Sequence, residues 1–112
     1  MSRFTIGTRA DASTTVLAIA GDLDVESTPA LRWAFLEAFA SGIGAVTVDL
    51  TELRLCDSVG LSTLIFGYQQ AGLRGVAFNV VNAREGVAAV LEITGLTGML
   101  TPAEGAPAKL TD

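Results

Sequence analysis

The stretch VDLTELRLCDSVGLSTLI, residues 48–65, contains the signals that decide the fold. It begins within the apolar run AVTVDL, residues 45–50, which is typical of a strand. It ends in a helical pattern that we predict over about residues 59–72. Between the two, Asp57 and Ser58 are of types preferred at helix N-termini, and we place Ser58 at or near the N-cap. A strand therefore passes through a loop into a helix.

Helix and strand signals alternate on both sides of this stretch. Thr28, as N-cap before a proline, predicts a helix start, and Gly42 predicts its C-terminal stop. Asn82 with Glu85 three residues later resembles a capping box and predicts a third helix that ends near Gly95. We expect the remaining strands at residues 4–9, 15–20, 76–81 and 98–100, with a hairpin turn at residues 10–13.

The order β-β-α-β-α-β-α-β predicts an α/β fold. Strands that alternate with helices imply βαβ crossovers, so we expect a mixed four- to five-stranded sheet packed with helices and begun by an antiparallel hairpin. One domain is expected over residues 1–102, followed by a flexible C-terminal tail at 103–112. The predicted core faces of the first two helices are Leu31, Ala34, Phe35, Ala38 and Phe39, and Leu61, Leu64, Ile65 and Tyr68.

Composition excludes several classes of protein. The 112-residue chain has a formal net charge of −5, which argues against nucleic-acid binding because phosphate contacts need clustered Lys and Arg. It has no apolar run long enough to span a membrane and no signal peptide, so we expect a cytoplasmic protein with no membrane insertion. With no histidine and one cysteine, we expect no enzyme, no metal site and no cofactor.

Other local features have simple structural interpretations. Asp22, Asp24 and Glu26 lie close together, but without the pattern of a calcium-binding loop they indicate a solvated loop. The Gly42–Gly44 pair follows a helix and precedes a strand, which indicates a turn and not a dinucleotide site. Cys56 is expected to be an unreactive apolar residue, because the neighbouring Asp57 disfavours a thiolate.

The Asp57–Ser58 pair has two interpretations that the residues alone leave open. Both side chains suit simple capping of the helix. A helix N-terminus also offers free backbone N–H groups and the positive end of the dipole, so a phosphate on Ser58 would be stabilised there. Beside Ser58, a face of the second helix is expected to lie off the core and to form a docking surface: Val59, Ser62, Thr63 and Phe66.

Three segments together resemble the STAS domain family. The segments are GDLDVESTPAL at residues 21–31, the stretch at 48–65 with its Asp-Ser-x-Gly-Leu motif, and LEITGLTGML at residues 91–100. They occur in the order and at the intervals of that family and span residues 21–100. Asp22 stands where the family often has Glu, and Val59 stands where it often has Ser or Thr.

The resemblance implies a bacterial anti-sigma factor antagonist in a partner-switching pathway. In that scheme the unphosphorylated protein binds an anti-sigma factor that is also a serine kinase, and the sigma factor is released. The kinase then phosphorylates Ser58, the complex dissociates, and a PP2C-type phosphatase resets the switch. The alternative is a non-switching STAS subunit that acts as a scaffold in a lipid-transport or signalling complex. The expected partner-binding residues are Asp22, Asp24, Asp57, Ser58, Val59, Gly60, Ser62, Thr63 and Phe66.

Overall fold

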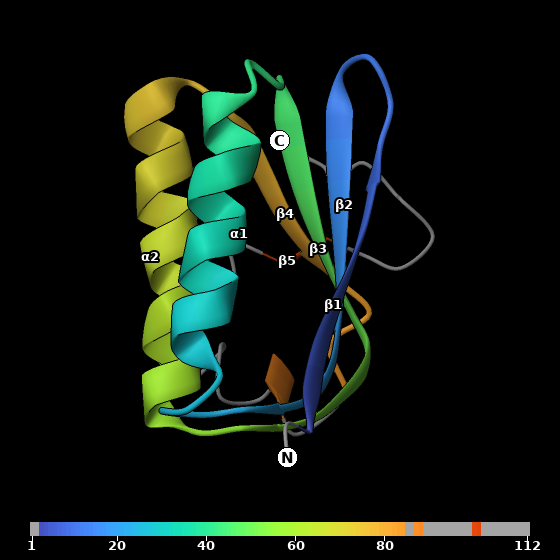
Figure 1. Cartoon of the computed structure of the whole chain (residues 1–112), viewed down its shortest axis with the longest axis vertical. Helices are drawn as coiled ribbons and strands as arrows, with labels where there is room; N and C mark the ends of the chain where they lie inside the picture. The colour runs from blue at the N-terminus through green and yellow to red at the C-terminus, as the bar shows by residue number, and fades with distance from the viewer. Residues whose placement is uncertain (1–2, 85–86, 89–99, 102–112) are drawn as a thin grey trace.

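Two helices cover one face of a mixed sheet (Figure 1). The computed structural model describes residues 3–84, 87–88 and 100–101. The helices are α1 (Thr28–Ala40) and α2 (Ser58–Arg74), which lie side by side. The strands are β1 (Phe4–Ala10), β2 (Thr14–Leu23), β3 (Ala45–Cys56), β4 (Ala77–Val81) and β5 (Leu100–Thr101).

The sheet has the order β1-β2-β3-β4-β5 and confirms the predicted mixed α/β fold. The β1–β2 hairpin is antiparallel, and the other neighbouring strands are parallel. The hairpin turn is closed by Asp11, whose Oδ1 accepts the N–H groups of Ser13 and Thr14, each at 2.9 Å. Parallel β2 and β3 run toward the same end, so the loops that follow them lie together.

Strands β2 and β3 are longer than the sequence predicts. We expected residues 51–56 to be a loop, but β3 continues to Cys56 and pairs Leu55 with Asp22. The strand was predicted to end at residue 50 because the charged residues Glu52 and Arg54 follow. Leu53, which lies between them, is nevertheless only 1% exposed. The strand therefore continues past the charges, although the spacing of its buried residues changes from two, at Val46, Val48 and Leu50, to three at Leu53. Two register shifts in the β2–β3 pairing accommodate the extra residues.

The core lies between the sheet and the two helices. On α1 it uses the predicted face, with Leu31 and Phe35 fully buried. On α2 the prediction of Tyr68 was wrong: this side chain is 40% exposed and only its ring edge approaches Phe78. Gly67 occupies the core position instead, because a Cβ atom there would lie 2.6 Å from the Phe35 ring. The largest fully buried side chains are Phe35, Leu17, Ile19, Leu23, Leu31, Leu50, Leu53, Leu64, Val46 and Val48.

The helix boundaries differ from the prediction by one or two residues. The N-cap of α1 is Ser27 and not Thr28, which places Thr28 in the first turn. Gly42 follows the end of α1 with φ +80°, as its predicted role as a stop requires. Helix α2 extends two residues past Gly72 to Arg74, where Gly75 ends it in the left-handed conformation.

The predicted third helix falls mostly outside the described residues. Val87 and Ala88 are helical, but Glu85 and residues 89–95 are not described. The side-chain amide of Asn82 donates to Asp49 Oδ1 at 3.0 Å and so links the end of β4 to β3. The predicted capping box involves Glu85 and therefore lies outside the described residues. The final strand pairs with β4 through Leu100 and Thr101, and it overlaps the predicted GML segment at Leu100, while residues 98–99 lie outside the described residues.

Candidate functional site

The candidate site lies at the carboxyl ends of β2 and β3. The β2–α1 loop, residues 24–27, and Asp57 at the start of α2 come together there because the two strands are parallel (Figure 1). Clefts outside the carboxyl ends of parallel strands are the usual place for function in α/β sheets. The structure brings the segment that contains Asp22 and Asp24 next to the segment that contains Asp57 and Ser58. A single partner-binding surface that includes all four residues, as predicted, needs this proximity.

Asp57 is the N-cap of α2. Its backbone is extended, and its Oδ1 accepts the N–H of Gly60 at 2.8 Å. Its carbonyl oxygen accepts the first helical hydrogen bond from Leu61 N–H, also at 2.8 Å. Asp57 is therefore the cap, and Ser58, which we predicted at or near the N-cap, is the first residue of the helix. This leaves the Ser58 hydroxyl free of the capping role.

Ser58 is exposed and its hydroxyl group is unengaged. Within the described part of the chain that hydroxyl has no hydrogen-bond partner, although the Ser58 carbonyl accepts Ser62 Oγ at 3.0 Å. In the same part of the chain, the N–H groups of Ser58 and Val59 also lack partners, because Asp57 occupies only the Gly60 N–H. Two free backbone donors and the positive end of a 17-residue helix thus adjoin an accessible hydroxyl.

Gly60 holds the start of α2 against β2. A Cβ atom on Gly60 would lie 2.4 Å from the Leu23 carbonyl oxygen, so only glycine fits this position. The same carbonyl accepts the Asp57 N–H at 3.2 Å. Because of this close packing Gly60 is buried, and its role here is to bring the Asp57–Ser58 corner onto the end of β2.

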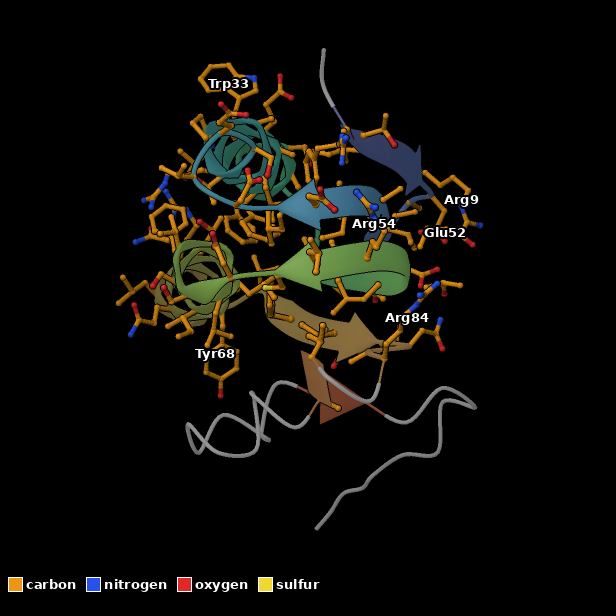
Figure 2. All side chains as sticks on the ribbon, turned by 90° about the horizontal axis from the view of Figure 1, so that it is seen from below. Arg9, Trp33, Glu52, Arg54, Tyr68 and Arg84 are labelled. Carbon is orange, nitrogen blue, oxygen red and sulfur yellow. The ribbon has the colours of Figure 1, made fainter. Side chains whose placement is uncertain are left out.

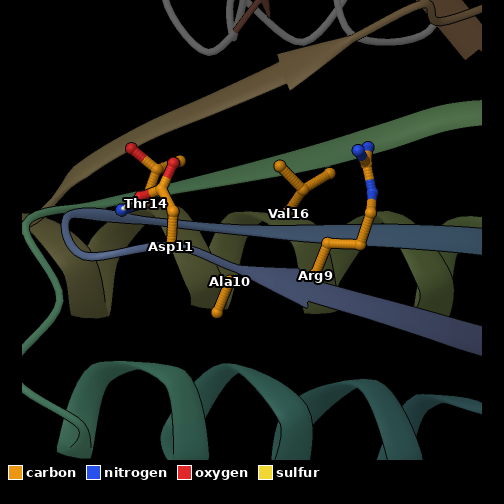
Figure 3. Close-up of a pocket in the computed structure, with 5 residues that line it drawn as sticks. All are labelled: Arg9, Ala10, Asp11, Thr14 and Val16. Carbon is orange, nitrogen blue, oxygen red and sulfur yellow. Dashed lines mark hydrogen bonds between the residues drawn. The ribbon is translucent and has the colours of Figure 1, made fainter.

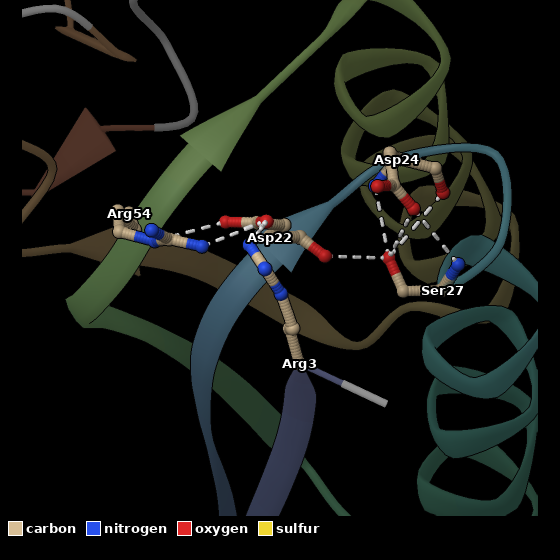
Figure 4. Close-up of polar contacts among 5 residues, drawn as sticks. All are labelled: Arg3, Asp22, Asp24, Ser27 and Arg54. Atoms are coloured by element: carbon tan, nitrogen blue, oxygen red, sulfur yellow. Dashed lines mark hydrogen bonds and ion pairs between the residues drawn. The ribbon is translucent and has the colours of Figure 1, made fainter. Parts of the chain in front are cut away.

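The β2–α1 loop is tied together by Asp24 and Ser27 (Figure 4). Ser27 Oγ accepts the Asp24 N–H and donates to the Asp22 carbonyl, both at 2.8 Å. Asp24 Oδ1 accepts the N–H groups of Glu26 at 3.0 Å and Ser27 at 3.3 Å. The Asp24 carboxylate is therefore engaged in a local turn, which agrees with the predicted solvated loop more than with a cation site.

Asp22 forms a two-pronged ion pair with Arg54 across β2 and β3 (Figure 4). The distances from Arg54 to the two carboxylate oxygens are 3.1 and 2.9 Å, and Arg3 approaches the same carboxylate at 3.9 Å. The sequence did not predict this pair, because Arg54 was expected in a loop. The signal that would have found it is the apolar–charged–apolar order of Leu53, Arg54 and Leu55, which is compatible with a strand, where side chains of neighbouring strands on one face can pair.

The predicted docking face of α2 is corrected at Thr63. This side chain is 1% exposed and its Oγ1 donates to the Val59 carbonyl, so it belongs to the core side of the helix. Ser62 and Val59 are exposed as expected. Phe66 is half-buried, and the guanidinium of Arg32 lies over its ring at 4.2 Å from the centroid. That cation–π contact links α1 to α2 and was not foreseen from the sequence.

Three large apolar side chains are exposed at this end of the molecule. Val25 in the β2–α1 loop is 65% exposed, Leu55 near the end of β3 is 58% exposed, and Val59 in the first turn of α2 is 42% exposed. They lie on the segments that meet at the carboxyl ends of β2 and β3, where Asp57 and Ser58 also lie. Single exposed apolar residues are ordinary, but several beside one accessible serine are typical of an interaction surface.

Cys56 has the character expected of an unreactive residue. Burial, assisted by the negative charge of Asp57, raises the pKa of its thiol to about 11. At neutral pH the thiolate fraction is therefore very small. Across the described residues, no group of three or more His, Cys, Asp and Glu side chains is placed to hold a metal ion. The helices of that same part of the chain are too short or too polar to cross a membrane.

A shallow depression of about 230 Å3 lies at the β1–β2 hairpin, at the opposite end of the sheet (Figure 3). Its lining includes Arg9 and Asp11. Hydrogen bonds from the backbone N–H groups of Ser13 and Thr14 lower the pKa of Asp11. That carboxylate serves the turn, so the depression has no unengaged acidic group, and the candidate site remains the corner that contains Ser58.

Comparison with known proteins identifies the class of this domain. A family model described as "Mlab, STAS domain" matches residues 6–102. The chain therefore belongs to the STAS domain family, and the resemblance inferred from its three motifs is confirmed. A search of curated proteins finds no match.

Solved structures support the same fold. An anti-sigma factor antagonist from Mycobacterium paratuberculosis superposes with a TM-score of 0.78 at 25% identity, over 88% of this chain and 84% of that one. SpoIIAA, described as a Bacillus cell fate determinant and solved in its phosphorylated form, gives a TM-score of 0.74 at 17% identity, over 88% and 91%. A serine-to-glutamate variant of RsbS from Moorella thermoacetica gives 0.73 at 24% identity, over 86% and 84%.

Proposed function

We propose that this chain is an anti-sigma factor antagonist of the cytoplasm whose binding is switched off by phosphorylation of Ser58. The observation that carries the proposal is the exposed, unengaged hydroxyl of Ser58 at the first position of α2. The similarity of the chain to the Mycobacterium paratuberculosis anti-sigma factor antagonist supports the role of antagonist. In this proposal the partner is an anti-sigma factor with serine kinase activity, and a PP2C-type phosphatase restores the binding form.

The fold would accept a phosphate at Ser58 with little change. A phosphoserine adds roughly −1.5 to −2 charges at pH 7. The free N–H groups of Ser58 and Val59 and the helix dipole favour an anion at this point. Asp57 repels it, but that carboxylate is directed to the Gly60 N–H by its capping bond. We therefore expect the modified domain to stay folded.

The partner interface would bear the cost of the modification. The surface at this end of the molecule includes the exposed apolar side chains of Val25, Leu55 and Val59. A partner that covers these side chains would also remove water from the phosphate, and burying an unpaired dianion is expensive. Phosphorylation is therefore expected to abolish binding without unfolding the antagonist.

The first test is intact-mass measurement and phosphopeptide mapping of the protein isolated from its native cells, with and without phosphatase treatment. One phosphate on Ser58 is expected. Ser62, which is exposed one turn later, provides the matched control: Ser62→Ala should keep the phosphate, and Ser58→Ala should lose it. Absence of phosphate under every growth condition would overturn the switch.

The second test measures binding. Each anti-sigma factor serine kinase of the same cells would be purified and titrated with wild-type protein, Ser58→Asp and Ser62→Asp by calorimetry. We expect Ser58→Asp to weaken binding by at least about a hundredfold, since the introduced charge would be buried without a partner. Ser62→Asp should weaken it less. Equal affinities of Ser58→Asp and wild type for a kinase that binds the latter would contradict the proposal.

A second candidate is a non-switching STAS subunit that acts as a scaffold in a lipid-transport or signalling complex. One observation favours it: the description of the matching family model names Mlab and does not name an anti-sigma factor antagonist. Val59, apolar where the family often has Ser or Thr, is consistent with it. The phosphopeptide measurement separates the two candidates, because a scaffold needs no phosphate on Ser58.

A further inference from the structure

Strand β1 is a long, regular edge of the sheet. Its 7 residues pair one to one with β2, from Phe4 opposite Gly21 to Ala10 opposite Thr15, without a bulge. No strand in the described part of the chain pairs with its outer side, whereas β5 at the other edge has 2 residues. Proteins usually protect such edges with proline, bulges or very short strands, and β1 has none of these.

The hairpin turn shows which backbone groups of β1 face outward. The N–H of Asp11 donates to the Thr14 carbonyl, so Asp11 and Thr14 form a hydrogen-bonded pair. Such pairs alternate along an antiparallel ladder, so Thr5, Gly7 and Arg9 bond to β2. The N–H and C=O groups of the residues between them, Ile6 and Thr8, therefore point away from β2 toward the open edge.

Apolar side chains flank this edge on the helix-covered face. Trp33 is 64% exposed and projects from α1 on the side away from α2, at the same side of the molecule as β1 (Figure 2). Ile6 is half-buried on that face, since it lies opposite the core residue Ile19. An edge with outward backbone groups beside an exposed tryptophan is well suited to the addition of another strand.

We propose that two copies of this chain associate through β1 strands paired antiparallel about a two-fold axis at Gly7. Charge favours a second copy in this register. Arg3 lies four residues before Gly7 and Asp11 four residues after it, so each Arg3 faces the Asp11 of the other copy. The Arg3 side chain is 71% exposed, and its contact with Asp22 is long, at 3.9 Å, so it can turn toward that carboxylate. Ile6 and Thr8 of the two copies exchange the backbone hydrogen bonds.

This arrangement leaves both Ser58 sites open. The two-fold axis reverses the strands, so the Ser58 corners lie at opposite ends of the joined sheet, while both helix layers cover the same face. The two Trp33 side chains then approach the junction from the two α1 helices. The inference goes beyond the proposed switch and does not depend on it.

The register is tested by cysteine cross-linking of the full chain in a Cys56→Ala background. Across the two-fold axis Gly7 forms a pair without hydrogen bonds, where Cα atoms lie about 4.5 Å apart, within reach of a disulfide. A Cβ atom at Gly7 has only the Ala18 carbonyl nearby, at 3.9 Å, so cysteine fits there. With copper-phenanthroline as oxidant, Gly7→Cys should form a covalent dimer. Thr5→Cys, which faces Arg9 of the second copy, is the matched control and should not.

The association itself is measured by sedimentation and light scattering from micromolar to millimolar protein. Thr8→Pro removes an outward N–H and leaves the β1–β2 bonds in place, so the variant should fold and should dissociate at least about a hundredfold more readily. Trp33→Ala should weaken the dimer more than Leu73→Ala, its exposed counterpart on α2. A monomeric wild type at every concentration, a dimer unaffected by Thr8→Pro, or equal cross-linking of the two cysteines would overturn the proposal. Pairing of the edge with an added peptide alone would also count against a second copy.

Discussion

The two helices begin at the same end of the molecule in opposite ways. Helix α1 starts from Ser27, whose side chain makes no capping bond into the helix, and Ser27 and Thr28 are almost fully buried. Helix α2 starts from Asp57, whose carboxylate caps Gly60, and Asp57, Ser58 and Val59 are all exposed. One helix start is closed by its own loop, and the other is open to solvent.

The difference follows from which groups the cap residues bond. Ser27 Oγ bonds backward to the loop, to the Asp22 carbonyl and the Asp24 N–H. Pro29 then removes one of the backbone donors that α1 would offer. Asp57 bonds forward to Gly60 and leaves two N–H groups beside Ser58. Both helices follow a strand and begin at a residue type that favours capping. The start of α1 is nevertheless buried against its own loop, whereas the start of α2 is accessible to solvent.

The largest effect is expected from closing the space at Gly60. In Gly60→Ala the added Cβ atom would meet the Leu23 carbonyl at 2.4 Å, so the start of α2 must move away from β2. We expect a loss of roughly 2–3 kcal/mol in the free energy of unfolding, measured by urea denaturation. Gly72→Ala is the matched control on the same helix, because nothing lies within 4 Å of its new Cβ atom. It should gain up to about 1 kcal/mol; equal effects of the two would refute the packing argument.

Next in size is the closed start of α1. Ser27→Ala removes the partner of the Asp24 N–H and of the Asp22 carbonyl in a partly buried loop. Leaving such groups unsatisfied costs about 1–3 kcal/mol, and we expect a loss near the lower half of that range in chemical denaturation. In the exposed position Ser62→Ala should change stability by less than about 0.5 kcal/mol. If Ser27→Ala were equally neutral, the α1 start would not be closed by its loop.

The positions of the two helix starts were predictable from the sequence, but the direction in which each cap residue forms its hydrogen bonds was not. Residue type placed a helix start at Asp57–Ser58 and another at Thr28, and alternation found the strands that carry them. Which side chain bonds forward and which backward depends on local backbone angles: ψ is −173° at Asp57 and −16° at Ser27. Capping propensity is nearly equal for Asp and Ser, so it could not separate the two cases.

The misassigned residues share a physical cause. Tyr68 and Thr63 were assigned from helical spacing alone, which ignores how closely α1 approaches. Gly67 lets the Phe35 ring sit against the α2 backbone, and this contact rotates the buried face toward Thr63 and Gly67 and away from Tyr68. The Asp22–Arg54 pair was missed because it joins residues 32 positions apart, and it becomes visible only once β2 and β3 are in register.

At the open start of α2, two substitutions of Asp57 separate the contribution of its capping hydrogen bond from that of its charge. Asp57→Ala should cost about 1 kcal/mol through loss of the bond to the Gly60 N–H. Asp57→Asn retains an acceptor of the same shape and should lower the free energy of unfolding by only about 0.3 kcal/mol. Thermal denaturation of the two variants measures this. A loss in Asp57→Asn as large as in Asp57→Ala would show that charge, and not the capping bond, stabilises this end of α2.

The smallest effect is expected at the ion pair that joins the two strands beneath both helix starts. Arg54→Gln removes the two contacts to Asp22, and because the Arg54 side chain is 55% exposed the loss should be at most about 0.5–1 kcal/mol. Arg54→Lys should recover only part of it, since one ammonium group cannot meet both carboxylate oxygens as the guanidinium does. The wild-type advantage should shrink as salt rises from low ionic strength to 1 M, because exposed charges are screened. Asp22 also presents its carbonyl to Ser27, so the pair aligns the end of β2 with the loop that closes α1. If the advantage of Arg54 did not change with salt, packing of its aliphatic stem would be the stabilising interaction, and the alignment would not be electrostatic.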